Sequence, residues 1–228
     1  MTKFTTHEEL KAAGAMWTKE KEKAKEKYGP IEEWDVSEVD SFQSIFQGGK
    51  GFNEDLSSWK LDKCTNMSGM FYDCSDFTPG KTLNGWDTSK VTNFSYCFAR
   101  CDKFDGDLSD WDVSSCENFS TFFGHNFCLN FDASKWNTAK GSNMNCMFSN
   151  CTIFKSDLSA WNVSKCRNMK CMFEECKELK CNFRKWDTRV VREAKNMDDM
   201  FKNCTAMQET PFNWKPKGSK GSSMCVIS

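Results

Sequence analysis

The chain has 228 residues, 39% hydrophobic and 28% charged, and is therefore long enough to bury a sizeable core as one large domain or two small ones. Thirty-one basic residues against 32 acidic ones leave a formal charge of -1, which argues against a protein held to nucleic acid by its overall field. The sequence contains no run of 18 or more apolar residues, and its first residues lack the apolar segment of a signal peptide. We therefore expect neither a membrane-spanning helix nor export by a visible signal.

Residues 1–33 are predicted to form an N-terminal capping helix. Thr6 and Glu9 have the spacing of a capping box, and Gly29-Pro30 is typical of a helix end. Between them lies a loose apolar stripe, made of Leu10, Ala13, Trp17 and Ala24. The alternating Lys and Glu residues of the same segment are interpreted as a solvated face rather than an interaction helix.

Tryptophan recurs at a nearly constant interval through the rest of the chain. Successive residues of this series are separated by 25 to 28 positions: Trp34, Trp59, Trp86, Trp111, Trp136, Trp161, Trp186 and Trp214. A period this steady indicates a repeat array, and seven units cover residues 34–213.

Each unit contains two patterns that predict secondary structure. Apolar residues at i, i+3, i+4 and i+7, such as Met67, Met70, Phe71 and Cys74, predict a short helix. An Asn precedes this pattern and is interpreted as its N-cap, at Asn66, Asn93, Asn118, Asn143, Asn168 and Asn196. The segment around the Trp is rich in strand formers and predicts one short strand. The expected fold is an α/β repeat solenoid of about seven 25-residue coils, each with one strand and one helix, with capped ends.

The units read approximately WDVSxVxNMxxMFxxCxxFxxDLSx, as in residues 86–110 and 161–185. This pattern resembles the BspA-like repeat of bacterial and protist surface proteins, which is related to leucine-rich repeats. The resemblance covers about residues 34–209 and implies a right-handed, leucine-rich-repeat-like solenoid. It also implies a role in adhesion or protein binding, without catalytic residues to transfer.

The 14 cysteines admit three interpretations. Five share the i+7 position of the unit (Cys74, Cys101, Cys151, Cys176 and Cys204), and three alternate with Val or Gly at another position (Cys64, Cys116 and Cys166), as expected of small buried side chains. Stacked residues such as Cys151 and Cys176 could form disulfides, but free thiols are favoured in the cytosol. The five-residue spacing of Cys166, Cys171, Cys176 and Cys181 does not fit the paired knuckles of structural zinc sites, so no metal is expected.

Two other polar patterns have a structural and a functional interpretation. A row of Asp and Asn follows the tryptophans (Asp35, Asp87, Asp112, Asn137, Asn162 and Asp187) and could bind Ca²⁺, but turn capping is favoured. Several N-x-S/T triplets would be glycosylation acceptors in a secreted chain. Because Asn66, Asn93 and Asn118 are expected to be caps, these triplets are interpreted as by-products of the repeat.

The predicted third region, residues 214–228, is a flexible basic tail with a lipidation signal. It ends in Cys225-Val-Ile-Ser, which has the C-a-a-X pattern for prenylation, of the kind that usually selects farnesyl. Lys215, Lys217 and Lys220 precede it in a Gly/Ser-rich stretch accessible to a prenyltransferase. We expect a covalent farnesyl group on Cys225, no other cofactor, and binding of the three lysines to an anionic membrane surface.

The function expected from these observations is a non-enzymatic protein-binding scaffold, held peripherally on the cytoplasmic face of a membrane. Its partner is an unknown protein, and the candidate contact residues are the variable ones beside the predicted strand: Lys60, Asp110, Lys135 and Lys185. Two alternatives stay open, an exported adhesin and a structural component of a larger assembly. A cysteine nucleophile paired with His125 is the weaker enzymatic alternative.

Overall fold

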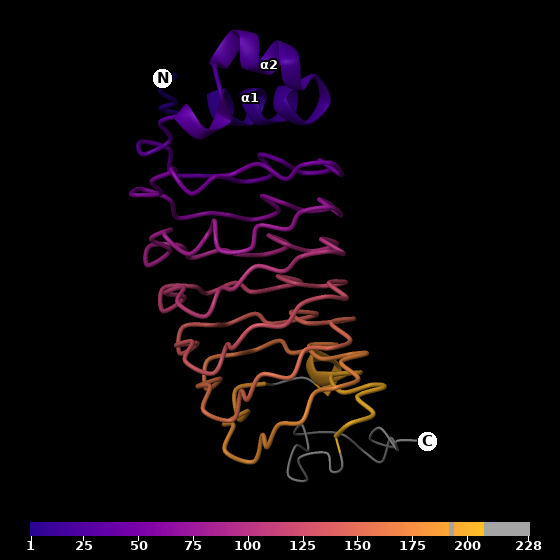
Figure 1. Cartoon of the computed structure of the whole chain (residues 1–228). Helices are drawn as coiled ribbons and strands as arrows, with labels where there is room; N and C mark the ends of the chain where they lie inside the picture. Colours follow the sequence, from indigo (N-terminus) through magenta and orange to yellow (C-terminus); the bar gives the residue numbers. More distant parts are fainter. Residues whose placement is uncertain (192–193, 208–228) are drawn as a thin grey trace.

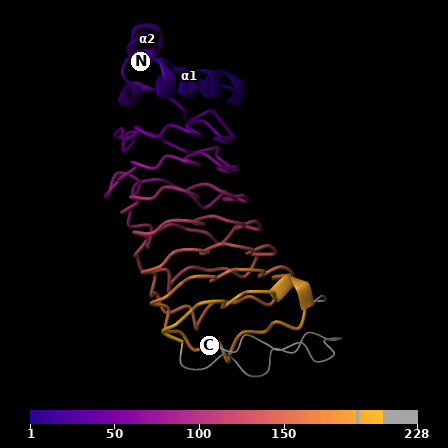
Figure 2. The ribbon, with the colours of Figure 1, turned by 90° about the vertical axis from the view of Figure 1, so that its right-hand side faces the viewer.

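The computed structural model describes residues 1–191 and 194–207. Its named elements are the helices α1 (His7–Lys19) and α2 (Lys21–Tyr28) and two short 3-10 helices, η1 (Ile31–Glu33) and η2 (Ala194–Met197). From η1 onward the chain winds in coils that lie one below another, with α1 and α2 at one end of the stack (Figure 1 and, at right angles, Figure 2). No helix among the described residues is long and apolar enough to cross a bilayer.

The N-terminal segment folds onto the first coil. The predicted capping box is confirmed: the Thr6 hydroxyl accepts a hydrogen bond from the Glu9 amide at 3.3 Å, and the Glu9 carboxylate accepts one from the Thr6 amide. The predicted single helix is two helices, because the backbone leaves the helical region at Glu20 (φ -140°, ψ 59°). Gly14 lies against the first coil so closely that a Cβ there would come within 2.6 Å of the Ile45 carbonyl oxygen.

The predicted α/β solenoid, with one helix and one strand in every coil, is wrong. Between residues 34 and 191 the described chain contains no α-helix, and its β-pairing consists of isolated parallel bridges rather than strands. The bridges join Ser41 with Asn66 and then the predicted N-cap residues of successive coils, Asn66 with Asn93 and on through Asn118 and Asn143 to Asn168. The described part of the coils consists mainly of turns and irregular segments, so the leucine-rich-repeat-like architecture that was expected is not found there.

Each bridging Ser or Asn together with the eight residues after it, such as 66–74 and 93–101, will be called the ladder segment, and positions in it are counted from the residue that follows the bridging one. Alternate amides of this segment bond to the next coil: Met67 donates to the Asn93 carbonyl at 2.9 Å and Gly69 to the Ser95 carbonyl at 2.8 Å. The amides between them close turns inside the coil, as Met70 does by donating to the Met67 carbonyl at 3.2 Å. Both kinds of bond are needed to satisfy the backbone, and neither a helix nor a sheet results.

Left-handed residues interrupt every ladder segment and explain why no helix forms. The third and seventh residues after the bridging position have φ between 52° and 64° in twelve non-glycine cases among the described residues, for example Tyr96 and Arg100. An L-residue pays about 1–2 kcal/mol for this conformation, which a regular helix never uses. The bonds to the next coil offset that cost. The apolar pattern identified the inward side chains correctly, because Met67, Met70, Phe71 and Cys74 are all buried.

Two aromatic columns fill the core. Phe rings at the fifth position of the ladder segment stack from coil to coil, with centroids 5.4 Å apart between Phe71 and Phe98 and 5.8 Å apart between Phe148 and Phe173. Tryptophan rings form the second column, as between Trp161 and Trp186 at 6.4 Å. Each such pair adds about 0.5–1.5 kcal/mol beyond its buried area. Every stacked indole in the described repeats donates its N–H to a backbone carbonyl of an earlier residue.

The shared cysteine position also forms a buried column. The thiol of Cys101 donates to the Phe71 carbonyl at 3.0 Å, and that of Cys176 donates to the Phe148 carbonyl at 3.0 Å. Burial raises the pKa of both thiols well above the usual range, which disfavours the reactive thiolate. The prediction of small buried side chains is therefore confirmed at these positions.

Candidate binding surface

The outward side of the ladder segments, here called the ladder face, carries a hollow of about 270 Å³. We call it the tyrosine hollow. Three neighbouring coils contribute the residues that line it: Gln43, Ser44, Gln47, Ser68, Gly69, Tyr72, Ser95 and Tyr96. The second, third and sixth positions of successive ladder segments supply all eight residues. The register of the ladder therefore brings together side chains that lie up to 53 residues apart in sequence.

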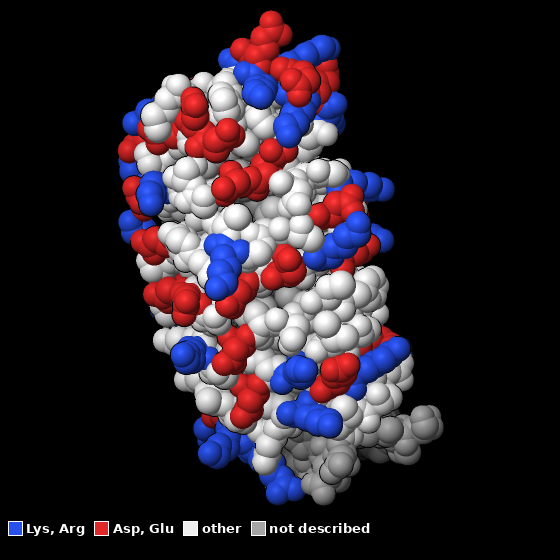
Figure 3. All heavy atoms as spheres, viewed as in Figure 1, with Lys and Arg blue, Asp and Glu red and all other residues white. Residues whose placement is uncertain are grey.

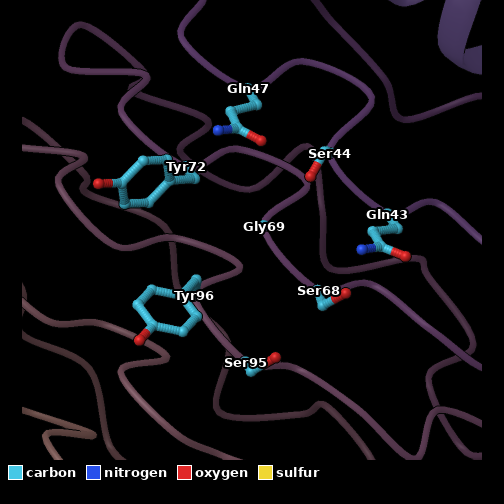
Figure 4. Close-up of a pocket in the computed structure, with 8 residues that line it drawn as sticks. All are labelled: Gln43, Ser44, Gln47, Ser68, Gly69, Tyr72, Ser95 and Tyr96. Carbon is cyan, nitrogen blue, oxygen red and sulfur yellow. The ribbon is translucent and has the colours of Figure 1, made fainter.

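Two tyrosines form one side of the hollow. The rings of Tyr72 and Tyr96 meet edge to face, with centroids 6.1 Å apart, and Tyr96 is 47% exposed. Figure 4 shows both rings on one side and the serines and Gln43 on the other. A hydrogen bond with the Tyr72 side chain and the negative charge of Asp73 raise the pKa of Arg100.

The lining of the hollow carries no charged side chain; its groups are amides, hydroxyls and phenols. The face of the molecule shown in Figure 3 has Lys and Arg interspersed with Asp and Glu, without a large region of one sign. Exposed ion pairs account for part of this mixing, for example Lys63 with Glu38 and Lys103 with Asp76. Such a surface suits hydrogen bonding and aromatic contact more than long-range attraction of a charged ligand.

The four predicted contact residues lie elsewhere. Lys60, Asp110, Lys135 and Lys185 are exposed and directly adjoin the tryptophans, and none of them lines the hollow. The tryptophan column contacts the phenylalanine column across the core, as Phe71 does Trp86 at 6.4 Å. The ladder face therefore lies on the opposite side of the core from these four residues.

The rows of acidic and amide residues form turns. In the predicted Ca²⁺ or turn-capping row, each side-chain oxygen accepts a hydrogen bond from the amide two residues later, as Asp87 does from Ser89 at 3.0 Å and Asn162 from Ser164 at 3.0 Å. Hydrogen bonds from the Ser89 hydroxyl and then from the Ser89 amide lower the pKa of Asp87. The turn-capping interpretation is confirmed. Asn66, Asn93 and Asn118 make the same bond, so they cap turns rather than helices.

The four cysteines considered for zinc are separated by the fold. Cys166 donates to the Asn168 carbonyl, Cys176 lies in the buried column, and Cys181 contacts Asp157. Cys171 lies on the ladder face and belongs to none of these groups. Within residues 1–191 and 194–207, no group of three or more His, Cys, Asp or Glu side chains could hold a metal ion.

Cys225, Lys215, Lys217 and Lys220 lie outside the described residues. So does Trp214, the last member of the tryptophan series.

The tyrosine hollow was not predicted from the sequence. Its signal is that the chain has only three tyrosines and two of them occupy ladder positions one repeat apart. Their meeting depends on the unexpected left-handed turns.

The repeats match a known family. A protein-family sequence model described as "Mycoplasma protein of unknown function, DUF285" matches residues 16–109, 78–186 and 107–214. These overlapping matches span most of the chain. No curated protein and no solved structure is similar enough to the chain to match it.

Proposed function

The chain belongs to the DUF285 family, and on that premise we propose that it is a non-enzymatic protein-binding scaffold whose binding surface is the tyrosine hollow. The observation that carries the proposal is the pair of tyrosines on the ladder face, one of them 47% exposed beside uncharged polar groups. Tyrosine is enriched among the residues that dominate binding energy at protein interfaces, because it combines a rigid apolar ring with a hydroxyl.

The size and shape of the hollow favour a protein partner over a small substrate. Small-molecule sites usually enclose about 300–1,000 Å³ and bury most of their ligand. The tyrosine hollow has about 270 Å³ and is open to solvent along the surface. It would accept one or two side chains projecting from a partner.

The experiment compares the two sides of the coil stack. A photo-reactive phenylalanine analogue is placed at position 96 or, as the matched control, at exposed position 135 beside the tryptophan column. We expect a protein cross-linked at position 96, with capture lost in Tyr72→Ser and retained in Lys60→Ser. If the partner cross-links at position 135, and capture is lost in Lys60→Ser but not in Tyr72→Ser, the originally predicted contact residues form the surface and the hollow does not.

The second part of the proposal is a membrane tether. A farnesyl group on Cys225 would supply reversible affinity for a cytoplasmic leaflet, since one lipid chain alone binds only marginally. Lys215, Lys217 and Lys220 would each add about 1 kcal/mol near an anionic surface. The support for this tether is the Cys-Val-Ile-Ser pattern and the lysine-containing stretch before it.

The tether is tested by metabolic labelling with a prenyl analogue and by membrane fractionation. An intact mass first determines whether Ser228 is the last residue before processing, as the motif requires. We expect label and membrane association in the native protein and neither in Cys225→Ser, while Cys204→Ser keeps both. A native protein that takes no label and stays entirely in the supernatant contradicts the tether but leaves the binding surface intact.

The alternative of an exported adhesin makes an opposite prediction. It would place sugars on Asn150 or Asn203, both of which lie on the ladder segments with left-handed backbone. Glycans found there by mass spectrometry of the native protein would favour the adhesin over the cytoplasmic scaffold.

A further inference from the structure

Cys146 and Cys171 are direct neighbours across the ladder. Each is the third residue after a bridging Asn, and the two bridging residues, Asn143 and Asn168, pair in parallel. The Cys146 amide donates to the Lys170 carbonyl at 2.8 Å, which keeps the two cysteines in register. Adjacent parallel chains lie about 4.8 Å apart. This spacing falls within the Cα separation of roughly 4.4–6.8 Å that a disulfide accepts.

Both cysteines have the same backbone conformation and partial exposure. Their φ angles are 53° and 52°, so their side chains leave the ladder in the same direction. Each is half-buried on the ladder face, whereas the stacked cysteines of the inner column are buried, with their thiols directed at carbonyl oxygens. Among the described cysteines, the Cys146–Cys171 pair combines coil-to-coil register with access to solvent.

We propose that Cys146 and Cys171 are a redox modification site, at which a low-molecular-weight disulfide such as oxidised glutathione joins two neighbouring coils by a reversible disulfide bond. The Cys146 thiolate attacks one sulfur of the oxidant, which releases one thiol and leaves a mixed disulfide. Cys171 then loses its proton and attacks the Cys146 sulfur, which releases the second thiol. Two protein thiols are oxidised and one disulfide is reduced to two thiols.

Cys171 lies close to the Glu174 carboxylate. Burial, followed by the negative charge of Glu174, raises the pKa of Cys171 to about 12, so its thiolate is scarce. The Glu174 carboxylate also forms an ion pair with Lys202, at 3.1 Å. Cys171 is therefore suited to the second step, where its partner sulfur is held next to it and proximity compensates for the scarce thiolate.

The site shares a row with the tyrosine hollow. Ser44, Gly69 and Tyr96 of the hollow occupy the same third position of their ladder segments as Cys146 and Cys171 do further along the stack. A disulfide there would fix the spacing of two coils on the ladder face. The proposal does not rest on the hollow's being a binding surface, because the chemistry requires only the two thiols.

The test treats the native full-length protein with oxidised glutathione, at increasing concentration until exposed Cys128 carries a glutathionyl group. Free thiols are then blocked and the protein is digested with trypsin. Cleavage after Lys140, Lys155, Lys170 and Lys177 places Cys146 on one peptide with Cys151, and Cys171 on another with Cys176. Fragmentation of the linked peptides must therefore assign the bridge to the individual cysteines.

We expect the two peptides to be linked through Cys146 and Cys171, and the thermal midpoint to rise and return after reduction. The variant Cys171→Ser should keep a glutathionyl group on Cys146, and Cys146→Ser should acquire less on Cys171. Serine fits this turn, because Ser44 occupies the equivalent place with φ of 57°. A bridge through Cys151 and Cys176, separate glutathionyl groups on Cys146 and Cys171 in the native protein, or modification of Cys128 alone would each overturn the proposal.

Discussion

Asn126 occupies the place that the neighbouring coils give to cysteine, and it is fully buried. Its amide nitrogen donates to the Phe98 carbonyl at 2.6 Å and to the Phe123 carbonyl at 2.9 Å. No described residue donates to its side-chain oxygen. In the next coil, the Cys151 thiol donates to the Phe123 carbonyl at 3.2 Å and leaves no such oxygen unpaired. We therefore predict that Asn126→Cys stabilises the protein.

The magnitude follows from two opposing changes. Removing a buried acceptor without a partner recovers about 1–3 kcal/mol of desolvation cost. Replacing the amide donors of Asn126 by one weaker S–H donor loses about 1 kcal/mol, and the two side chains are similar in size. The free energy of unfolding should rise by about 1 kcal/mol. The reverse exchange, Cys101→Asn in the preceding coil, should lower it by about 1–3 kcal/mol.

Urea unfolding under reducing conditions measures both exchanges. The midpoint should increase for Asn126→Cys and decrease for Cys101→Asn with an unchanged slope, so that each shift reports stability. If Asn126→Cys lowers the midpoint or leaves it unchanged, the unpaired oxygen does not carry the assigned cost.

Three further predictions concern the core, the N-terminal helices and the loss of stability at low pH. Phe98→Ala should lower the free energy of unfolding by about 3–5 kcal/mol, because Phe98 is fully buried in the phenylalanine column. The control Tyr96→Ala, in the same turn but partly exposed, should lower it by under about 1 kcal/mol in the same urea titration. Gly14→Ala should lower the free energy of unfolding by about 1–3 kcal/mol, because the new Cβ would lie 2.5 Å from the Ile45 side chain and push α1 away from the first coil. Amide hydrogen exchange in α1 should then be faster, and unchanged exchange would contradict the close packing. Hydrogen bonds from Arg189 lower the pKa of Asp187 to about 2 in the folded protein, against about 4 in the unfolded chain. The ionised Asp187 carboxylate therefore stabilises the fold above about pH 4, and this contribution is lost as the pH falls towards 2. Asp187→Asn should make the urea midpoint less sensitive to acid between about pH 4 and pH 2, and an unaltered pH profile would contradict this assignment.

Part of the candidate surface could be read from the sequence and part could not. The repeat fixes that residues 25 or 27 positions apart become neighbours, so Cys146 and Cys171, or the Asp and Asn turn caps, could be paired in advance. The tyrosine hollow could not be predicted, because the backbone conformation of the ladder segments decides which outward side chains of successive coils lie together. The third residues of the two segments that carry its tyrosines, Gly69 and Tyr96, have left-handed backbone that the sequence pattern does not indicate.

The sequence by itself determined the period, the inward residues and the capping box. These depend on local spacing and on the preference of apolar side chains for burial, which any compact arrangement of the repeat has to satisfy. The backbone conformation of the repeat was decided only by the tertiary structure. An isolated unit with apolar residues at i, i+3, i+4 and i+7 favours a helix. In the stack, alternate amides such as those of Met67 and Gly69 bond to the carbonyls of the next coil, and that set of bonds offsets the cost of the left-handed turns.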